Sequence, residues 1–143
     1  MGKILIIIFC CVTFFAQAQE VSGWQLLAEV TFETKAADQN GFEVDLPKFS
    51  RRLKEADGKK ITLKGYLIPL SELDGKQQYM LSSLPFNSCY FCGGAGPETV
   101  VELDLKEKIN FVTKQIAMEG TLTLNASDPD HHIFILKNPK MTP

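Results

Sequence analysis

Two cysteines separated by two residues form the motif of this sequence that carries the most chemistry. The motif and the glycines after it comprise Cys89, Cys92, Gly93, Gly94 and Gly96. This spacing lets both sulfurs converge on one point, where they bind a metal ion or bond to each other. The glycines permit positive φ, and a turn of this kind aims backbone N–H groups at thiolate sulfurs.

Three common cysteine chemistries are excluded by the residues around the pair. Covalent haem attachment needs histidine directly after the second cysteine, where Gly93 stands. A thioredoxin-like centre needs a helix after its first cysteine, which the glycines and Pro97 oppose. An iron–sulfur cluster needs about four thiolates. A disulfide that stiffens the turn, one half of a zinc site and a thiol–disulfide exchange pair remain as alternatives.

A structural zinc site needs four ligands, so two would have to come from elsewhere in the chain. The candidates are His131 and His132, the two histidines of the sequence, and Glu98 as an oxygen ligand. We expect the histidines to begin a strand and point to opposite faces, so that at most one reaches the cysteines. An exposed turn around residues 128–131 is the simpler interpretation of this segment. No serine–histidine–acid set or catalytic carboxylate pair is identified, which favours a non-enzymatic role.

The first eighteen residues have the three parts of a secretory signal. Lys3 is followed by the apolar run Ile4 to Phe15, and Ala16-Gln17-Ala18 supplies the small residues of a cleavage site. The run is shorter than the roughly 20 residues of a membrane span. The sequence therefore predicts a signal peptide over residues 1–18, a single exported domain over 19–143 and no membrane insertion after cleavage.

Export places the protein in the periplasm or outside the cell, where nearby thiols are usually bonded or metal-bound. Cys10 and Cys11 leave with the signal, so Cys89 and Cys92 remain. The 143 residues are 45% hydrophobic and 22% charged, which excludes a disordered chain and a polytopic membrane protein. A net charge of −2 gives no reason to expect nucleic-acid binding.

A hydrophobic period of two dominates the rest of the chain and predicts strands. The predicted strands run from Trp24 to Phe32, Lys59 to Leu70, Tyr79 to Leu84, Thr99 to Leu105, Met118 to Asn125 and His132 to Leu136. Between Pro47 and Gly58 the apolar residues Phe49, Leu53 and Ala56 have helical spacing. We expect one short helix there, with Pro47 in its first turn and Gly58 as its stop.

Gly65 and Gly120 interrupt two of these strands. An interior glycine usually marks a bulge or a sharp bend of a barrel. Short, bent strands favour a small OB-like β-barrel, closed or partly open, because closure removes exposed strand edges. A small β-sandwich is the alternative.

Several motifs resemble those of a bacterial exported family, the domain of unknown function 3299. They are Phe49-Ser50, Gly58 to Ile61, Gly65-Tyr66-Leu67-Ile68-Pro69-Leu70, Tyr79-Met80-Leu81, and the Cys89 loop followed by Pro97 and Thr99-Val100-Val101. The similarity covers residues 24–125. It implies export and a small single domain. In the family the loop carries cysteine-x-histidine, whereas here Phe91 holds the histidine position and Cys92 follows.

The sequence thus predicts a non-enzymatic accessory or binding module of the bacterial cell envelope, with an unidentified protein partner. Its functional surface is the loop of Cys89 and Cys92, with a transition metal such as zinc as the candidate cofactor. The alternatives are a thiol–disulfide redox protein that uses this pair, and a partner-binding barrel in which the pair is a structural disulfide.

Overall fold

The structure, a computed structural model, describes residues 23–35, 44–70 and 78–142. The predicted signal peptide lies outside these residues. Five strands form a closed barrel in the order β3-β4-β5-β7-β6. Their bounds are β3 Lys60–Pro69, β4 Tyr79–Ser82, β5 Val100–Asp104, β6 Ile116–Leu124 and β7 Phe134–Thr142.

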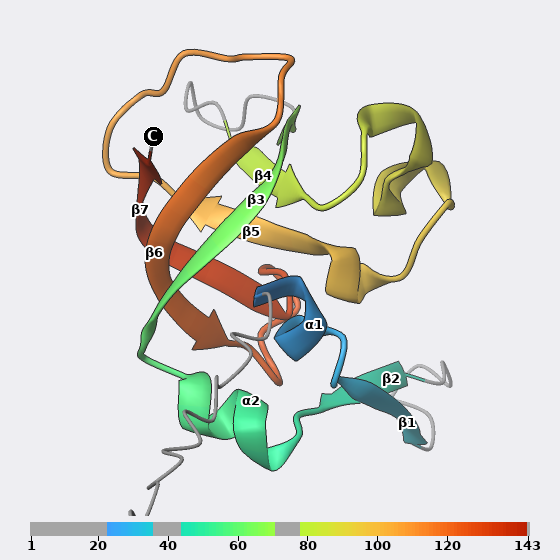
Figure 1. The fold of residues 1–143 in the computed structure, drawn as a ribbon. Helices are drawn as coiled ribbons and strands as arrows, with labels where there is room; N and C mark the ends of the chain where they lie inside the picture. Colours follow the sequence, from blue (N-terminus) through green and yellow to red (C-terminus); the bar gives the residue numbers. More distant parts are fainter. Residues whose placement is uncertain (1–22, 36–43, 71–77, 143) are drawn as a thin grey trace, which may run out of the picture.

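The barrel has the strand order of an OB-fold (Figure 1). The pairs are antiparallel except β5 and β7, which run parallel, and β3 closes the ring by pairing with β6. The prediction of a small OB-like barrel is therefore confirmed in its closed form, and the sandwich alternative is wrong.

Strand β3 bends at Gly65, as the interior glycine predicts. Residues Lys60–Gly65 pair with β6, whereas Tyr66–Pro69 pair with β4, so one strand serves two sides of the barrel. A Cβ on Gly65 would collide with the backbone carbonyl oxygen of Ser82. The close approach of two backbones therefore requires glycine at this corner.

The other interior glycine marks a bulge. The β6–β7 register shifts between Glu119 and Thr121, on either side of Gly120. On the facing strand, Asn138 has a φ of 49°. Strand β7 continues past this irregularity to Thr142, beyond the predicted end at Leu136.

The core fills the barrel and is built from alternate residues of each strand. Its fully buried members include Leu63 on β3, Leu81 on β4, Val101 on β5, Leu122 on β6 and Phe134 on β7. Alternation therefore turns the intervening side chains outward, and Glu102 and Lys137 belong to this outer surface.

The segment before the barrel contains two helices instead of one. The predicted strand from Trp24 to Phe32 is wrong, because the structure has helix α1 over Gly23–Leu27 and strand β1 over Thr31–Lys35. Leu27, which breaks the alternation, is fully buried. The Trp24 indole N–H donates to the Lys64 carbonyl oxygen at 2.8 Å, which fixes α1 against β3.

Helix α2 over Arg51–Ala56 confirms the predicted helix, but its start differs. Ser50 is the N-cap, and its side chain accepts a hydrogen bond from the Leu53 backbone N–H at 3.1 Å. Pro47 lies instead in strand β2 (Val44–Lys48), which pairs with β1 as a two-stranded hairpin.

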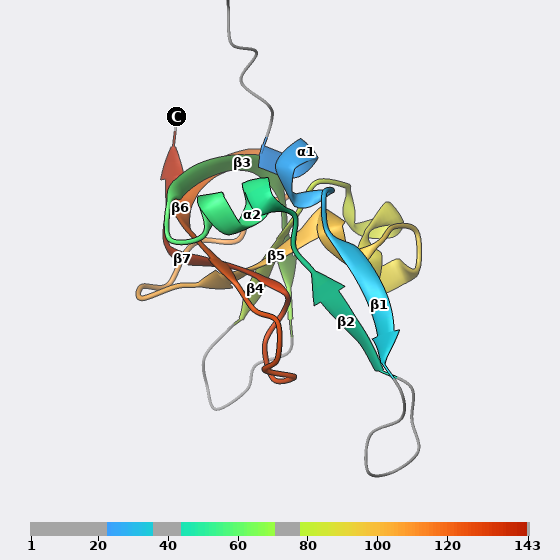
Figure 2. The same ribbon diagram turned by 90° about the horizontal axis from the view of Figure 1, so that it is seen from below.

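The helices and the hairpin lie at different places around the barrel. Figure 2 shows α1 and α2 against one end of the barrel, with the β1–β2 hairpin projecting from its side. Neither helix in the described part of the chain is long and apolar enough to cross a membrane.

Candidate functional site

The two cysteines lie in the segment that joins β4 to β5, which we call the cysteine loop (residues 83–99; Figure 1). Its base is closed by a hydrogen bond of 2.9 Å from the Ser83 N–H to the Thr99 carbonyl oxygen. Between these residues the chain makes three short 3₁₀ turns, Phe86–Ser88, Tyr90–Cys92 and Pro97–Thr99. The loop is therefore a series of turns, in agreement with its glycine content.

The two thiols have different environments although they face each other. Cys89 is fully buried in a small apolar cluster with Ile68, Met80 and Val100. Cys92 is exposed, and its thiol donates to the Phe86 carbonyl oxygen at 3.1 Å. Both residues are free thiols in this structure. The two thiols are close enough to interact, with Cys89 as the buried partner and Cys92 as the accessible one.

The environment of Cys92 favours its protonated form. Desolvation of the sulfur, followed by the adjacent Cys89 thiol, raises the pKa of Cys92 above its ordinary value. The thiolate is the nucleophile in exchange reactions, so a raised pKa lowers the reactive fraction at neutral pH. The Cys92 thiol is consequently a poor attacking group.

The glycines act by different means. Gly93 has a φ of 73° and ends the turn of Tyr90–Cys92 in the left-handed region, which favours glycine. Gly94 lacks room for a side chain, because a Cβ would lie 2.7 Å from the Ser88 carbonyl oxygen. At Gly96 a Cβ would meet the carboxylate of Glu98, which folds back over the loop.

The backbone N–H groups of Cys92, Gly93 and Gly94 donate to backbone carbonyl oxygens and not to the sulfurs. The N–H groups of Cys92 and Gly94 donate to the Cys89 carbonyl oxygen, at 3.1 and 3.3 Å, and that of Gly93 donates to the Tyr90 carbonyl. The expectation that they stabilise thiolates is therefore wrong, because the short turns use these donors to close themselves.

The two histidines lie before β7, which begins at Phe134, and not within a strand. His131 is exposed, and its Nδ1 lies 2.8 Å from Oε1 of Glu102 on β5. The second carboxylate oxygen of Glu102 accepts the His132 backbone N–H at 2.9 Å. The hydrogen bond that the Glu102 carboxylate accepts from His131, and the negative charge of this carboxylate, raise the pKa of His131.

His132 is packed between aromatic rings. Its ring centroid lies 6.2 Å from that of Tyr90 and 6.4 Å from that of Phe134. Nδ1 accepts the Phe134 backbone N–H at 3.2 Å, whereas Nε2 is buried without a partner among the described residues. Burial lowers the pKa of His132, so this ring is neutral at pH 7.

We expect the pKa values of the two adjacent histidines to lie on opposite sides of the ordinary value of 6.5, with that of His131 above it and that of His132 below it. The Glu102→Gln variant should bring the His131 midpoint down towards 6.5 and leave His132 nearly unchanged, because its shift comes mainly from burial. The stabilising His131–Glu102 pair is present below pH 6.5 and is lost as the pH rises through the raised pKa. Two-dimensional NMR titration of the imidazole protons measures both midpoints. Equal midpoints, or no response of His131 to Glu102→Gln, would contradict this account.

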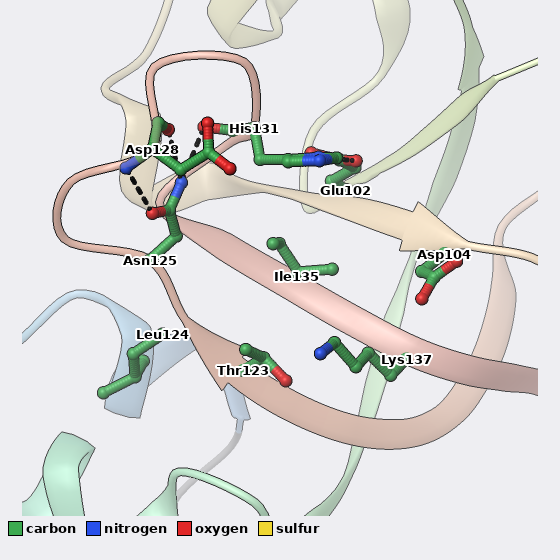
Figure 3. A pocket seen from close by; sticks show the side chains of 9 residues that line it. All are labelled: Glu102, Asp104, Thr123, Leu124, Asn125, Asp128, His131, Ile135 and Lys137. Carbon is green, nitrogen blue, oxygen red and sulfur yellow. Dashed lines mark hydrogen bonds and ion pairs between the residues drawn. The ribbon is translucent and has the colours of Figure 1, made fainter.

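The segment that carries the histidines is held by one amide side chain. The Asn125 amide donates to the carbonyl oxygens of Asp128 and His131, at 2.7 and 2.9 Å, and its oxygen accepts the Asp128 N–H at 2.9 Å. Figure 3 shows this arrangement at the rim of a cavity of about 490 Å³ on the outer face of β5, β6 and β7. The loop thereby places His131 over Glu102.

The predicted zinc ligands do not come together. Within the described residues, no three side chains of histidine, cysteine, aspartate or glutamate are grouped so that they could hold a metal ion. The pair Cys89 and Cys92 is therefore not completed by His131, His132 or Glu98. A zinc ion on the two thiols would be two ligands short of the usual four, and zinc binding stays a prediction.

The structure adds three residues to the candidate site. Glu102 reaches His131 because β5 and β7 pair in parallel, with Glu102 opposite Ile135. Phe32 and Asp45 belong to the β1–β2 hairpin and share a cavity with Tyr90 of the cysteine loop. The sequence places Glu102 on the outer face of a strand, but no local signal indicates what it meets there.

Comparisons with known proteins concern the fold. No protein-family model matches the sequence, and no curated protein is a significant match. The structure is similar to the crystal structure of a DUF3299 family protein from Pseudomonas aeruginosa PAO1, with 19% sequence identity and a TM-score of 0.49. The match covers 68% of this chain and 66%, just under two thirds, of that one. No site residue of this chain is assigned from that protein.

Proposed function

We propose that this protein is an exported, non-enzymatic binding module that docks a protein partner of the cell envelope through its cysteine loop. The observation that carries the proposal is the exposure of three aromatic side chains on this loop. Phe86, Tyr90 and Phe91 are 56%, 39% and 47% exposed. Apolar groups gathered on a surface are typical of an interaction site, because a partner removes them from water.

The loop presents these rings on a fixed base. The rings of Tyr90 and Phe91 are in edge-to-face contact, with centroids 5.4 Å apart. Cys89, directly before Tyr90, is fully buried and anchors the turn to the barrel. Pre-organised rings lose little conformational entropy when they bind, which favours affinity.

The thiol pair supports this role by forming a disulfide that holds the loop in place, which we call the staple. In an oxidising compartment the two thiols give up two protons and two electrons to a disulfide-bearing oxidant, and an S–S bond joins Cys89 to Cys92. The mutual contact of the thiols favours this bond. The raised pKa of Cys92 and the burial of Cys89 weigh against the alternative of an exchange enzyme, which needs an accessible thiolate.

We expect a photo-crosslinking amino acid at position 91 to capture one specific partner in the cells that produce the protein. The matched control is position 111, because Phe91 and Phe111 are 47% and 48% exposed and only Phe91 belongs to the cysteine loop. Mass spectrometry identifies the adducts. The proposal fails if position 91 yields no specific adduct or yields the same adducts as position 111.

The state of the cysteines is read from the same preparation. After alkylation of free thiols in the cells, the staple predicts that Cys89 and Cys92 carry no alkyl group and that the chain lacks two hydrogens. Stoichiometric zinc on the native protein would instead support the metal hypothesis. Rapid exchange with glutathione, at a potential well above about −300 mV, would support the redox alternative.

A further inference from the structure

A cavity of about 420 Å³ lies where three distant segments of the chain meet. The β1–β2 hairpin contributes Phe32 and Asp45, the cysteine loop contributes Tyr90 and Pro97, and the segment before β7 contributes His131 to Ile133. Phe32 and Asp45 lie on the same face of the hairpin, because Thr34 pairs with Asp45 and shares a face with Phe32. The hairpin thus turns one aromatic ring and one carboxylate towards the cysteine loop.

The walls of this cavity are largely aromatic. Phe32 is 40% exposed and Tyr90 39%, so both rings offer surface to a ligand. The His132 ring packs against Tyr90 at a centroid distance of 6.2 Å and supports it from behind. Burial lowers the pKa of His132, so this wall is uncharged at neutral pH.

Asp45 brings a negative charge to the cavity. Its carboxylate accepts a hydrogen bond from the neutral Thr34 hydroxyl at 2.7 Å, and it makes no ion pair with any residue that the structure describes. His131 also lines the cavity, and its Nδ1, which is charged only when the ring is protonated, is paired with Glu102 at 2.8 Å. A carboxylate beside aromatic rings is the chemistry that recognises an organic cation.

We propose that this cavity, which we call the cation pocket, binds the positively charged side chain of a lysine or arginine of the protein partner. The charge would lie near Asp45 and over the faces of Phe32 and Tyr90, while the aliphatic stem contacts the rings. Apolar residues next to this side chain would cover Phe86 and Phe91. The inference rests on the proposed function and names the chemistry of its partner.

The test uses the purified protein and two small probes of the same shape. Nα-acetyl-lysine methylamide carries the cation, and Nα-acetyl-norleucine methylamide lacks it. We expect the lysine probe to give saturable NMR shifts at Phe32 and Tyr90, and the norleucine probe to give none at equal concentration. Asp45→Asn should weaken binding of the lysine probe by about tenfold, and Phe32→Leu by about three- to fivefold. Both residues are exposed, so neither substitution endangers the fold.

The matched control for Asp45→Asn is Asp104→Asn, which removes an exposed carboxylate that lines the other cavity. This control should change affinity by less than about twofold, because the two cavities have separate carboxylates. Equal shifts from norleucine, or equal affinity of Asp45→Asn and the unsubstituted protein, would overturn the cation pocket. If the pocket fails while position 91 still captures one partner, the proposed function stands without it. If the probe binds but position 91 captures nothing, the docking role of the loop fails instead.

Discussion

Replacing Phe134 by alanine is expected to lower the free energy of unfolding by about 3–5 kcal/mol. Phe134 is the first residue of β7 and is fully buried. Its ring centroid lies 5.9 Å from that of Phe49, which precedes α2, and 6.4 Å from that of His132. The substitution would leave a cavity between the barrel, the segment before α2 and the histidine that supports the cation pocket.

Urea unfolding with linear extrapolation measures this loss. The control is Met141→Ala on the same strand, where 48% of the side chain is exposed and the loss should stay below about 1 kcal/mol. In the folded fraction of Phe134→Ala, the pKa of His132 should rise towards its ordinary value, because the ring gains water. A loss as small as that of the control would show that Phe134 does not hold these parts together.

Gly65→Ala is expected to destabilise the protein by about 1–3 kcal/mol, as overpacking does in a tightly packed interior. The added Cβ meets the Ser82 backbone carbonyl, and neither β3 nor β4 can withdraw without loosening the paired residues Tyr66 and Ser82. The change therefore acts on the barrel corner at Ser82, the last residue of β4. The cysteine loop begins at the next residue.

Two comparisons isolate the cause of this destabilisation. Lys64→Ala, at an exposed neighbouring position, should stay within about 0.5 kcal/mol. Gly93→Ala should cost about 1–2 kcal/mol for a different reason, because φ is 73° there and no atom lies within 4 Å of the added Cβ. Thermal or urea unfolding of the three variants measures the differences. An unfolding free energy for Gly65→Ala equal to that of Lys64→Ala would contradict the close approach.

The barrel could be predicted from the sequence because the pattern of residues within each strand indicates it. In β6 buried residues alternate with partly exposed ones, and most of β3 follows the same alternation, which determines both strand type and orientation. Gly65 and Gly120 predict the bend and the bulge, since an interior glycine has few other uses in a strand. The sequence does not predict the full length of β7, because Asn138 and Pro139 are typical strand breakers. In the structure these two residues lie opposite the single residue Gly120 as a bulge, and pairing resumes beyond them.

The segment before the barrel is where the local pattern misleads. Helix α1 and strand β1 lie so close together that their apolar residues merge into one alternation between Trp24 and Phe32. Tertiary contacts stabilise the helical conformation of Gly23–Leu27. Leu27 is buried in the core, and the Trp24 indole N–H donates to the Lys64 carbonyl oxygen. A contact across forty residues leaves no periodic signal in the sequence.

The candidate site also has features that follow from local sequence and features that depend on tertiary structure. The convergence of Cys89 and Cys92 and the glycine at positive φ follow from spacing within one loop. The neighbours of that loop depend on the barrel order, which brings Glu102 to His131 and the hairpin to Tyr90. The sequence offered its two histidines as candidate ligands for the cysteines, but the parallel pairing of β5 and β7 places His131 beside the Glu102 carboxylate.

The position of β7 in the ring has a consequence for biosynthesis. This last strand fills the space between β5 and β6, so a nascent chain that lacks it leaves both neighbours with unpaired edges. Ring closure must therefore wait until the residues Phe134–Thr142 have been synthesised. A chain truncated before residue 134 would therefore expose two unpaired strand edges, which are a site for aggregation.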